Sequence, residues 1–503
     1  MNIRQTTSNL NRPLFLTIVM IGMFCSNFNQ TILAVAQPTL MHDFAISAAT
    51  AQWLSTGYSL IIGIMTPVTA WLADNYSSKW LYETSMLFFI LGTASCFFSH
   101  TFIQLLLGRL LQAIGGALLA GIGTTMLFSI YPPERRGTVS ALMGIVFGLA
   151  PAVGPTYAGW IIDQFRWNDV FGSLLPLLIL ALVLGSFGFQ DVVAKSRSRL
   201  DWPSVGLSTI GFGCLLFFCA MAGNWHWTDW RVIGGLLVGA IFTTAFFRRQ
   251  QHIENPVLKL SIFNDHNYRI AVTITSITQV AFAGFEFVLP LYLQTVRGLP
   301  AIKSGAVLIL GALTTAVMSP VTGYVLNHFG GRHMIRLGLF IMIVGTLPFL
   351  FVDAKTPMID LILLYAIRNF GFSAVNMPVT TLGMQNLTGS LIAHGSSGNN
   401  MLRFTASAIG TSILISVQQQ VQLSALNHGI HVLTATLRGY HTAFALVLVL
   451  LIGGSLLAEH LHERRLTAWF GFSSSVSLDS SSQMPLIPNT SENGGHEAGS
   501  SLF

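Results

Sequence analysis

One carboxylate in the chain lies in the middle of a long apolar segment. It is Glu286, within the sequence VAFAGFEFVL over 280–289. A charge is costly in such surroundings, so an acid there needs a specific reason. Because loss of water disfavours the ionised form of a carboxyl group, Glu286 is a candidate for taking up a proton and exchanging it for a cationic substrate. The alternative is a packed, hydrogen-bonded glutamate or one near the outer face.

Three arginines also lie in apolar segments or at their edges. Arg109 is followed by Gln112 and by a glycine pair that permits close helix contact. Since it can pair with polar groups of the first apolar segment, we expect Arg109 either to hold helices together or to relay a conformational change linked to protonation. Arg368 and Arg403 lie nearer the ends of their segments, where arginine reaches toward water, and we interpret them as structural.

Amide and aromatic side chains of the first two apolar segments are candidates for contact with a substrate. Amides can hydrogen-bond a substrate or a neighbouring helix, although they do not titrate. Aromatic rings can hold a flat or cationic ligand, or else pack in the core. The full set of candidate substrate-binding residues is Asn27, Asn29, Gln30, Trp53, Tyr58, Gln112 and Glu286.

A cluster of prolines and glycines interrupts one apolar segment, in the sequence APAVGPTYAG over 150–159. Proline removes a backbone hydrogen bond and bends a helix, and glycine permits tight contact. We therefore predict a bent helix in a moving interface, with Pro151, Gly154, Pro155 and Gly159 as gating residues.

The sequence gives no sign of a metal, a cofactor or an enzymatic reaction. The four cysteines all lie in apolar segments and have neither a disulfide nor a zinc spacing. The 14 histidines are scattered without ligand spacing. A GxxxxGK[ST] phosphate loop is absent from the sequence, which argues against an ATP-driven pump.

The elements that carry these residues are predicted to be membrane helices. Charged residues make up 9% of the 503, against about 25% in soluble proteins, and 52% are apolar. Such a composition excludes a soluble enzyme, a nucleic-acid binder and a disordered scaffold. Fourteen segments are long enough to span a bilayer: 14–36, 50–72, 81–99, 102–128, 138–162, 171–190, 203–222, 231–247, 270–293, 304–326, 334–352, 358–383, 402–421 and 441–459.

The basic residues orient these segments. The first one mimics a cleaved signal peptide, but its length and internal amides favour an uncleaved helix. With the N-terminus inside, sixteen of the 25 lysines and arginines fall on the cytoplasmic side and six outside. This obeys the positive-inside rule with both termini cytoplasmic, in a cell membrane. The positive net charge is therefore a topology signal, and no nucleic-acid partner is needed.

Two parts of the chain repeat one pattern. Asp74 and Lys79 lie in a short cytoplasmic turn, and Asn327 and Arg332 lie in a similar turn 253 residues later. Arg109 and Arg368 follow at an offset of 259. The repeat predicts two six-helix halves with an inserted helix pair, in which the turn residues act in gating.

We expect five parts. They are a cytoplasmic N-terminus over 1–13, an N-terminal half over 14–190, a linker with two extra helices over 191–268, a C-terminal half over 269–460 and a disordered cytoplasmic tail over 461–503.

These motifs together resemble the fourteen-helix drug:proton antiporter branch of the major facilitator superfamily, the EmrB/QacA type. The resemblance covers about residues 12–460. Six stretches carry it in order: NQTILAVAQP from Asn29, Trp53 with Tyr58, the turn from Ala70 to Lys79, Arg109 with Gln112 and Gly115, Gly154-Pro155 with Gly159, and Asn400 with Arg403 and Gly410.

The resemblance implies an all-α membrane transporter whose substrate site lies between its halves. It implies a monomer in the lipid bilayer that exports amphipathic or cationic drugs, driven by the proton-motive force through Glu286 and Arg109. One alternative is a specific metabolite transporter of the same fold, working by uptake or uniport. Another is a non-transporting scaffold or sensor, which the bent fifth helix argues against.

The chain departs from the family pattern at places that matter. Asn29 stands where the first helix of this branch usually has an acid, so the burden of proton binding shifts to Glu286. The turn keeps Asp74 and Lys79 but has Ala70, Asn75, Ser77 and Ser78 where Gly, Arg, Gly and Arg are usual, which predicts a weaker latch.

Overall fold

Every regular element in the described residues is a helix. The computed structural model describes residues 12–130, 149–150, 153–188, 201–222, 224–225, 227–253, 256, 258–387 and 390–462. In the first part of the chain the helices are α2 (Arg12–Thr31), α3 (Leu33–Asp43), α4 (Ala48–Ala51), α5 (Trp53–Asn75), α6 (Ser78–Phe97), α7 (Phe102–Ile130), a helix over 153–164, α9 (Asp169–Gly172) and α10 (Leu175–Gly188).

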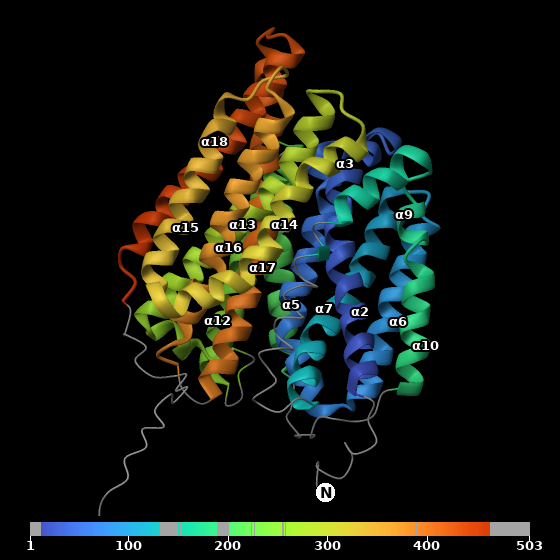
Figure 1. The fold of residues 1–503 in the computed structure, drawn as a ribbon, viewed down its shortest axis with the longest axis vertical. Helices are drawn as coiled ribbons and strands as arrows, with labels where there is room; N and C mark the ends of the chain where they lie inside the picture. The colour runs from blue at the N-terminus through green and yellow to red at the C-terminus, as the bar shows by residue number, and fades with distance from the viewer. Residues whose placement is uncertain are drawn as a thin grey trace, which may run out of the picture. The chain divides into compact units, whose positions relative to one another are not determined.

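The rest of the chain continues as helices (Figure 1). They are α11 (Trp202–Met221), α12 (Trp230–His252), η2 (Leu260–Asn264), α13 (His266–Thr295), α14 (Ala301–Phe329), α15 (Gly331–Thr346), η3 (Leu347–Phe351), α16 (Met358–Met384), α17 (Ser390–Asn427) and α18 (Val432–Ala458).

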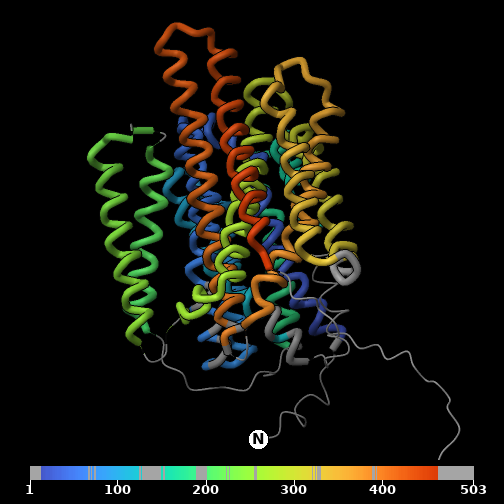
Figure 2. The backbone as a smooth tube through the Cα atoms, turned by 90° about the vertical axis from the view of Figure 1, so that its left-hand side faces the viewer, coloured from blue at the N-terminus to red at the C-terminus, as the bar shows by residue number. Residues whose placement is uncertain are grey.

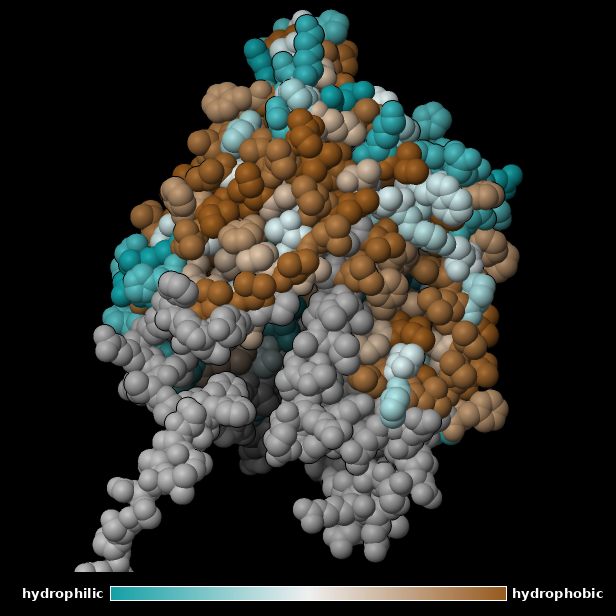
Figure 3. Space-filling view, viewed as in Figure 1, coloured by the Kyte–Doolittle hydropathy of each residue, from teal (hydrophilic) through white to brown (hydrophobic). Residues whose placement is uncertain are grey.

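Ten helices of the described part are long and apolar enough to cross a membrane. They match ten of the fourteen predicted segments. The other four coincide with α5, α6, α17 and the helix over 153–164, which are outside that set, so the count of fourteen remains a prediction. Apolar side chains form a broad brown region on the face in Figure 3, and the hydrophilic residues gather mainly at its upper end. The exposed apolar surface is suited to lipid contact.

Two large apolar clusters follow the predicted halves. One runs from Phe15 to Ala181. The other runs from Ile270 to Leu461 and also takes in three residues of the first half. Glu286 and Arg109 therefore lie on helices that are each fixed within a separate core.

Matching contacts occur in the two halves at equivalent positions. Lys79, at the start of α6, donates from Nζ to the carbonyl oxygen of Ser186 near the end of α10, at 2.6 Å. Arg332, at the start of α15, donates from Nη2 to the carbonyl oxygen of Glu459 at the end of α18, also at 2.6 Å. In each half a cation thus meets the negative end of the last helix, a favourable arrangement.

The hairpin of α11 and α12 stands beside the other helices (Figure 2). Its apolar contacts reach both halves, because Phe212 and Leu216 of α11 share a cluster with Leu60 of α5 and Met401 of α17. We call the end of the bundle near α4 and residue 224 the outer end and the opposite end the inner end, after the predicted orientation.

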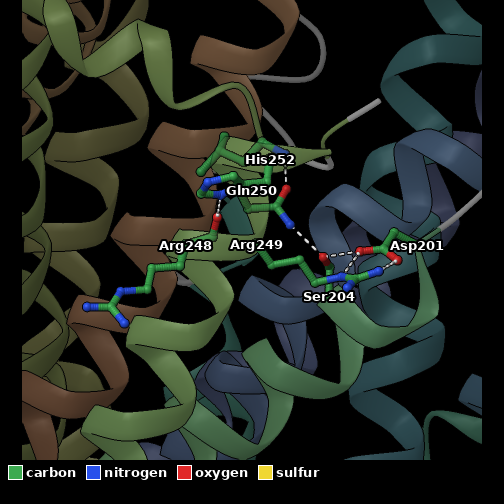
Figure 4. A network of polar contacts seen from close by, with 7 residues as sticks. Asp201, Ser204, Arg248, Arg249, Gln250 and His252 are labelled. Carbon is green, nitrogen blue, oxygen red and sulfur yellow. Dashed lines mark hydrogen bonds and ion pairs between the residues drawn. The ribbon is translucent and has the colours of Figure 1, made fainter. Parts of the chain in front are cut away.

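A polar network fastens the hairpin at its inner end (Figure 4). Arg249 binds Asp201 through two hydrogen bonds of 2.7 Å. Hydrogen bonding to the Arg249 guanidinium is the main reason that the pKa of Asp201 lies below its ordinary value. Gln250 is buried; its Nε2 donates to Ser204 Oγ at 2.6 Å, and its Oε1 accepts from the Leu258 amide at 3.0 Å. The hairpin is thus tied to the chain that leads into α13.

Glycine permits a close contact between two helices of the first half. A Cβ placed on Gly92 of α6 would lie 2.5 Å from the backbone nitrogen of Gln112 on α7. The equivalent Gly345 of α15 packs against the backbone of Arg368 on α16.

We expect Gly92→Ala to destabilise the protein, because overpacking a fixed backbone contact costs about 1–3 kcal/mol. The measurement is the midpoint of thermal unfolding in detergent. Gly234→Ala is the matched control, since no atom lies within 4 Å of its added Cβ. Equal midpoints for the two variants would contradict the tight α6–α7 contact.

Candidate functional site

Arg109 joins three helices at the centre of the first half. Its side chain is 0% exposed. Nη1 donates to the carbonyl oxygen of Asn29 on α2 at 3.2 Å and to Oε1 of Gln112 at 2.7 Å. Nε donates to the carbonyl oxygen of Leu54 on α5 at 3.4 Å, and the guanidinium lies 4.3 Å from the centre of the Tyr58 ring. The structure therefore brings together four of the predicted site residues.

A second layer holds this cluster in place. Gln112 Nε2 donates to Thr93 Oγ1 at 2.7 Å. The Tyr58 hydroxyl donates to the carbonyl oxygen of Ser26 at 3.4 Å. Since each bond crosses from one helix to another, the position of Arg109 is coupled to the packing of α2, α5, α6 and α7.

The charge of Arg109 has no carboxylate partner within 4 Å among the described residues. Carbonyl dipoles and the Tyr58 ring stabilise it instead. Both amide atoms of the Asn29 side chain, and Nη2 of Arg109, are buried without a hydrogen-bond partner in the described structure. Arg109 thus binds the backbone of the position at which the resembling family usually has an acid.

The second half contains a similar cluster around Arg368, which corrects the sequence interpretation. Arg368 does not reach toward water, because it is 0% exposed and lies within α16. Nη2 donates to the carbonyl oxygen of Ala281 on α13, and the guanidinium lies 4.1 Å from the centre of the Phe285 ring. Arg368 therefore binds the first helix of its half, as Arg109 does. The offset of 259 residues between the two arginines in the sequence already indicated that they occupy equivalent positions.

Glu286 lies next to this cluster. It follows Phe285 on α13 and is partly buried. Arg368 and Tyr365 of α16 are the charged and titratable groups that interact electrostatically with it. The buried Nε and Nη1 atoms of Arg368 have no hydrogen-bond partner in the described structure, so they are available to a carboxylate that changes its charge.

Tyr365 and Asn369 were not predicted as site residues. Both are almost completely buried on α16, on either side of Arg368. A Cβ on Gly311 of α14 would overlap the Tyr365 ring and approach the Asn369 amide, so this glycine makes room for them.

Three predicted contact residues lie outside the two clusters. Asn27 donates to the Met23 carbonyl oxygen of its own helix at 2.8 Å. Gln30 is partly buried on α2. Trp53 packs toward the hairpin, with its ring 6.3 Å from that of Phe217 on α11.

The predicted gating residues are described only in part. Pro151 and the side chains of Asp74 and Asn327 are outside the described residues. The proline–glycine segment packs against α14 of the other half. A Cβ on Gly159 would lie 2.6 Å from the Ala301 carbonyl oxygen, and one on Gly305 would lie 2.5 Å from that of Pro155.

Hydrogen bonds also join the two halves at the outer end. We call this line of contact between the halves the seam. The Asp163 carboxylate accepts the amide hydrogens of Ala301 at 3.2 Å and Ile302 at 2.9 Å, the first residues of α14. Gln294 Nε2 on α13 donates to the Val35 carbonyl oxygen on α3 at 3.0 Å. An acid at a helix N-terminus is favoured by the helix dipole. Asp163 was missed because its partner lies 138 residues away in the sequence.

The described residues contain no group of three or more His, Cys, Asp or Glu side chains that could hold a metal ion. The chemistry available in these clusters is proton binding by Glu286 and hydrogen bonding by amides and guanidinium groups.

Several known proteins are similar to this chain in sequence. The family Major Facilitator Superfamily matches residues 19–411. The chain is 37% identical to the uncharacterized MFS-type transporter YhcA of Bacillus subtilis, over 81% of this chain and 77% of that protein. It is 33% identical to the lincomycin resistance protein LmrB of Listeria monocytogenes, over 82% of this chain and 87% of that protein.

A solved structure shares the fold at low sequence identity. The peptide transporter POT in complex with sulfate aligns with a TM-score of 0.68 and 14% identity, over 92% of this chain and 99% of that chain. At this identity the likeness concerns the arrangement of the helices alone.

We expect Asn29→Asp to stabilise the protein at neutral and higher pH. The new carboxylate would lie beside Arg109, whose Nη2 has no partner in the described structure, and a charge-assisted hydrogen bond would form. The measurement is the thermal unfolding midpoint at about pH 7 and about pH 3, with a gain that shrinks at the lower pH as the acid is protonated.

Asn27→Asp is the control for that variant, because the described hydrogen bond of the Asn27 amide nitrogen is to a carbonyl oxygen of its own helix. A rise of the same size in both variants would show that Asn29 has no special relation to Arg109.

Proposed function

The chain belongs to the Major Facilitator Superfamily, and on this premise we propose that it is a proton-coupled exporter of amphipathic or cationic drugs. It is a multi-pass membrane protein and a transporter of small molecules, not an enzyme. Proton coupling, export and the class of substrate are the proposal. The observation that carries it is Glu286, a carboxylate within a membrane-spanning helix beside a buried arginine.

The mechanism assigns the exchange of proton and substrate to the cluster of the second half. With a proton bound, Glu286 is neutral and Arg368 rests on the Ala281 carbonyl oxygen and the Phe285 ring. When the proton leaves, the carboxylate gains a charge that attracts a cationic substrate and the free N–H groups of Arg368. Exchange of the proton for the substrate would couple the proton gradient to the transport of the substrate.

The rigid halves supply the conformational change. In transporters built from repeats, substrate sites lie between the halves, which rock about them. The closed outer end, with Asp163 on the first turn of α14, would represent the state open to the cytoplasm. The fourteen-helix drug:proton antiporter branch fits this scheme, with α11 and α12 as its inserted pair.

Lincomycin is the first substrate to test, because it appears in the name of the relative LmrB. Susceptibility to a panel of drugs, with the gene deleted and overexpressed, would define the range of substrates. A narrow range would favour the second candidate, a specific metabolite transporter of the same fold. Asn29 favours that candidate, since it removes one titratable group from the pathway.

We predict that Glu286→Gln abolishes proton-driven efflux while leaving the protein folded. Glutamine keeps the shape of the protonated acid but cannot release a proton. The measurement is dye efflux from energised membrane vesicles, for which we expect at least a tenfold loss of rate, together with the dependence on the pH gradient.

Glu83→Gln is the matched control, because it makes the same chemical change at a carboxylate whose side chain is 35% exposed and lies 3.9 Å from Lys79. Proton-driven efflux at the wild-type rate in the Glu286 variant would remove this residue from the mechanism.

A further inference from the structure

The outer end of α11 is fastened to α17, a helix of the second half. Ser416 Oγ donates to the Cys219 carbonyl oxygen at 2.7 Å. Gln420 Nε2 donates to the Ala222 carbonyl oxygen at 2.9 Å. Both acceptors are among the last carbonyls of the helix or just beyond it, which have no partner within α11 itself. The glutamine and serine of α17 therefore act as a C-terminal cap for α11.

The inner end of the hairpin is also fastened to the second half. Gln250 of α12 accepts the amide hydrogen of Leu258, and Leu258 is buried against Ile262 and Tyr268 at the start of α13. With both ends held, the hairpin should move together with α13 and α17.

A polar side chain of this hairpin also reaches the first half. Asn224, in the turn after α11, donates from Nδ2 to Thr50 Oγ1 at 2.8 Å and accepts a hydrogen bond from Ser47 Oγ. Gln419 of α17 donates to Asn224 Oδ1 at 3.3 Å and accepts the Ala49 amide hydrogen at 3.1 Å. Asn224 and Gln419 together thus bind three residues at the start of α4, which are Ser47, Ala49 and Thr50.

From these contacts we propose that the α11–α12 hairpin is a strap carried by the second half, and that Asn224 is a gating residue that closes the outer end by holding α4. The proposal rests on the alternating-access function proposed above. The hydrogen bonds of Asn224 to Thr50 and to Ser47, at the start of α4, join neutral groups and lie near the predicted aqueous surface. Water can therefore replace them when the outer end opens. The bonds to α17 persist in both states.

The proposal is also consistent with the apolar contacts that the described residues of the hairpin make with α5. Phe212 and Leu216 pack on Leu60 and Ile64 without a described hydrogen bond across that surface. Apolar surfaces carry no directional bonds, so they can slide past each other at little cost.

The test compares two cross-links in a background from which the four native cysteines have been removed. The first pair, Ser47→Cys with Asn224→Cys, joins the hairpin to the first half. The second pair, Ala222→Cys with Gln420→Cys, joins the hairpin to α17. We expect oxidation of the first pair to lower efflux at least tenfold, reversed by a reductant, and oxidation of the second pair to change efflux less than twofold.

The rate of cross-linking gives a second readout that does not need transport. Changing the pH from 5.5 to 8, or adding a transported drug, should change the rate for the first pair and leave that of the second pair constant. Equal behaviour of the two pairs, in efflux or in rate, would overturn the proposal. If neither double-cysteine variant exports drugs after reduction, but their cross-linking rates still differ in this way, the proposed export function is wrong and the proposal for the hairpin is supported.

Discussion

The buried guanidinium groups of Arg109 and Arg368 determine how each half of the molecule is built. Each is 0% exposed and binds a backbone carbonyl of the first helix of its half. A cation in such a place is tolerated only where carbonyl oxygens and an aromatic ring replace water around it. The helices must therefore approach closely, and Gly92 and Gly345 permit this at equivalent places.

The two halves differ in what surrounds this common arrangement. In the second half a carboxylate, Glu286, lies near the arginine. In the first half no carboxylate lies within 4 Å of Arg109 among the described residues, and the residue of the first helix that binds it is Asn29, through a backbone carbonyl oxygen. In the proposed cycle Arg368 would meet a neutral or a charged partner, whereas Arg109 would not. On that proposal the first half would serve as a fixed reference against which the second half moves.

Much of the fold could be predicted from the sequence, because apolar length is a local property. The predicted segment over 358–383 agrees with α16 within one residue at each end. The predicted segment over 402–421 lies within a longer helix, since α17 runs from Ser390 to Asn427. Two polar residues near the end of that segment, Gln419 and Gln420, hydrogen-bond α4 and the end of α11. Hydropathy cannot distinguish an amide that meets another helix from one that meets water.

The site was predictable where polar, charged or aromatic residues stand out within apolar segments. Arg109, Gln112 and Tyr58 were found from their types and spacing, and the structure brings them together. Asp163 and Asn224 were not found, because each acts on a helix more than 130 residues away in the chain. Their roles depend on how the halves meet, which is a property of packing across the molecule. A repeat in the sequence defines each half well but says little about the seam between them. In a transporter that works by rocking, it is the seam that changes. The residues of greatest mechanical interest are therefore those that sequence patterns are least able to reveal.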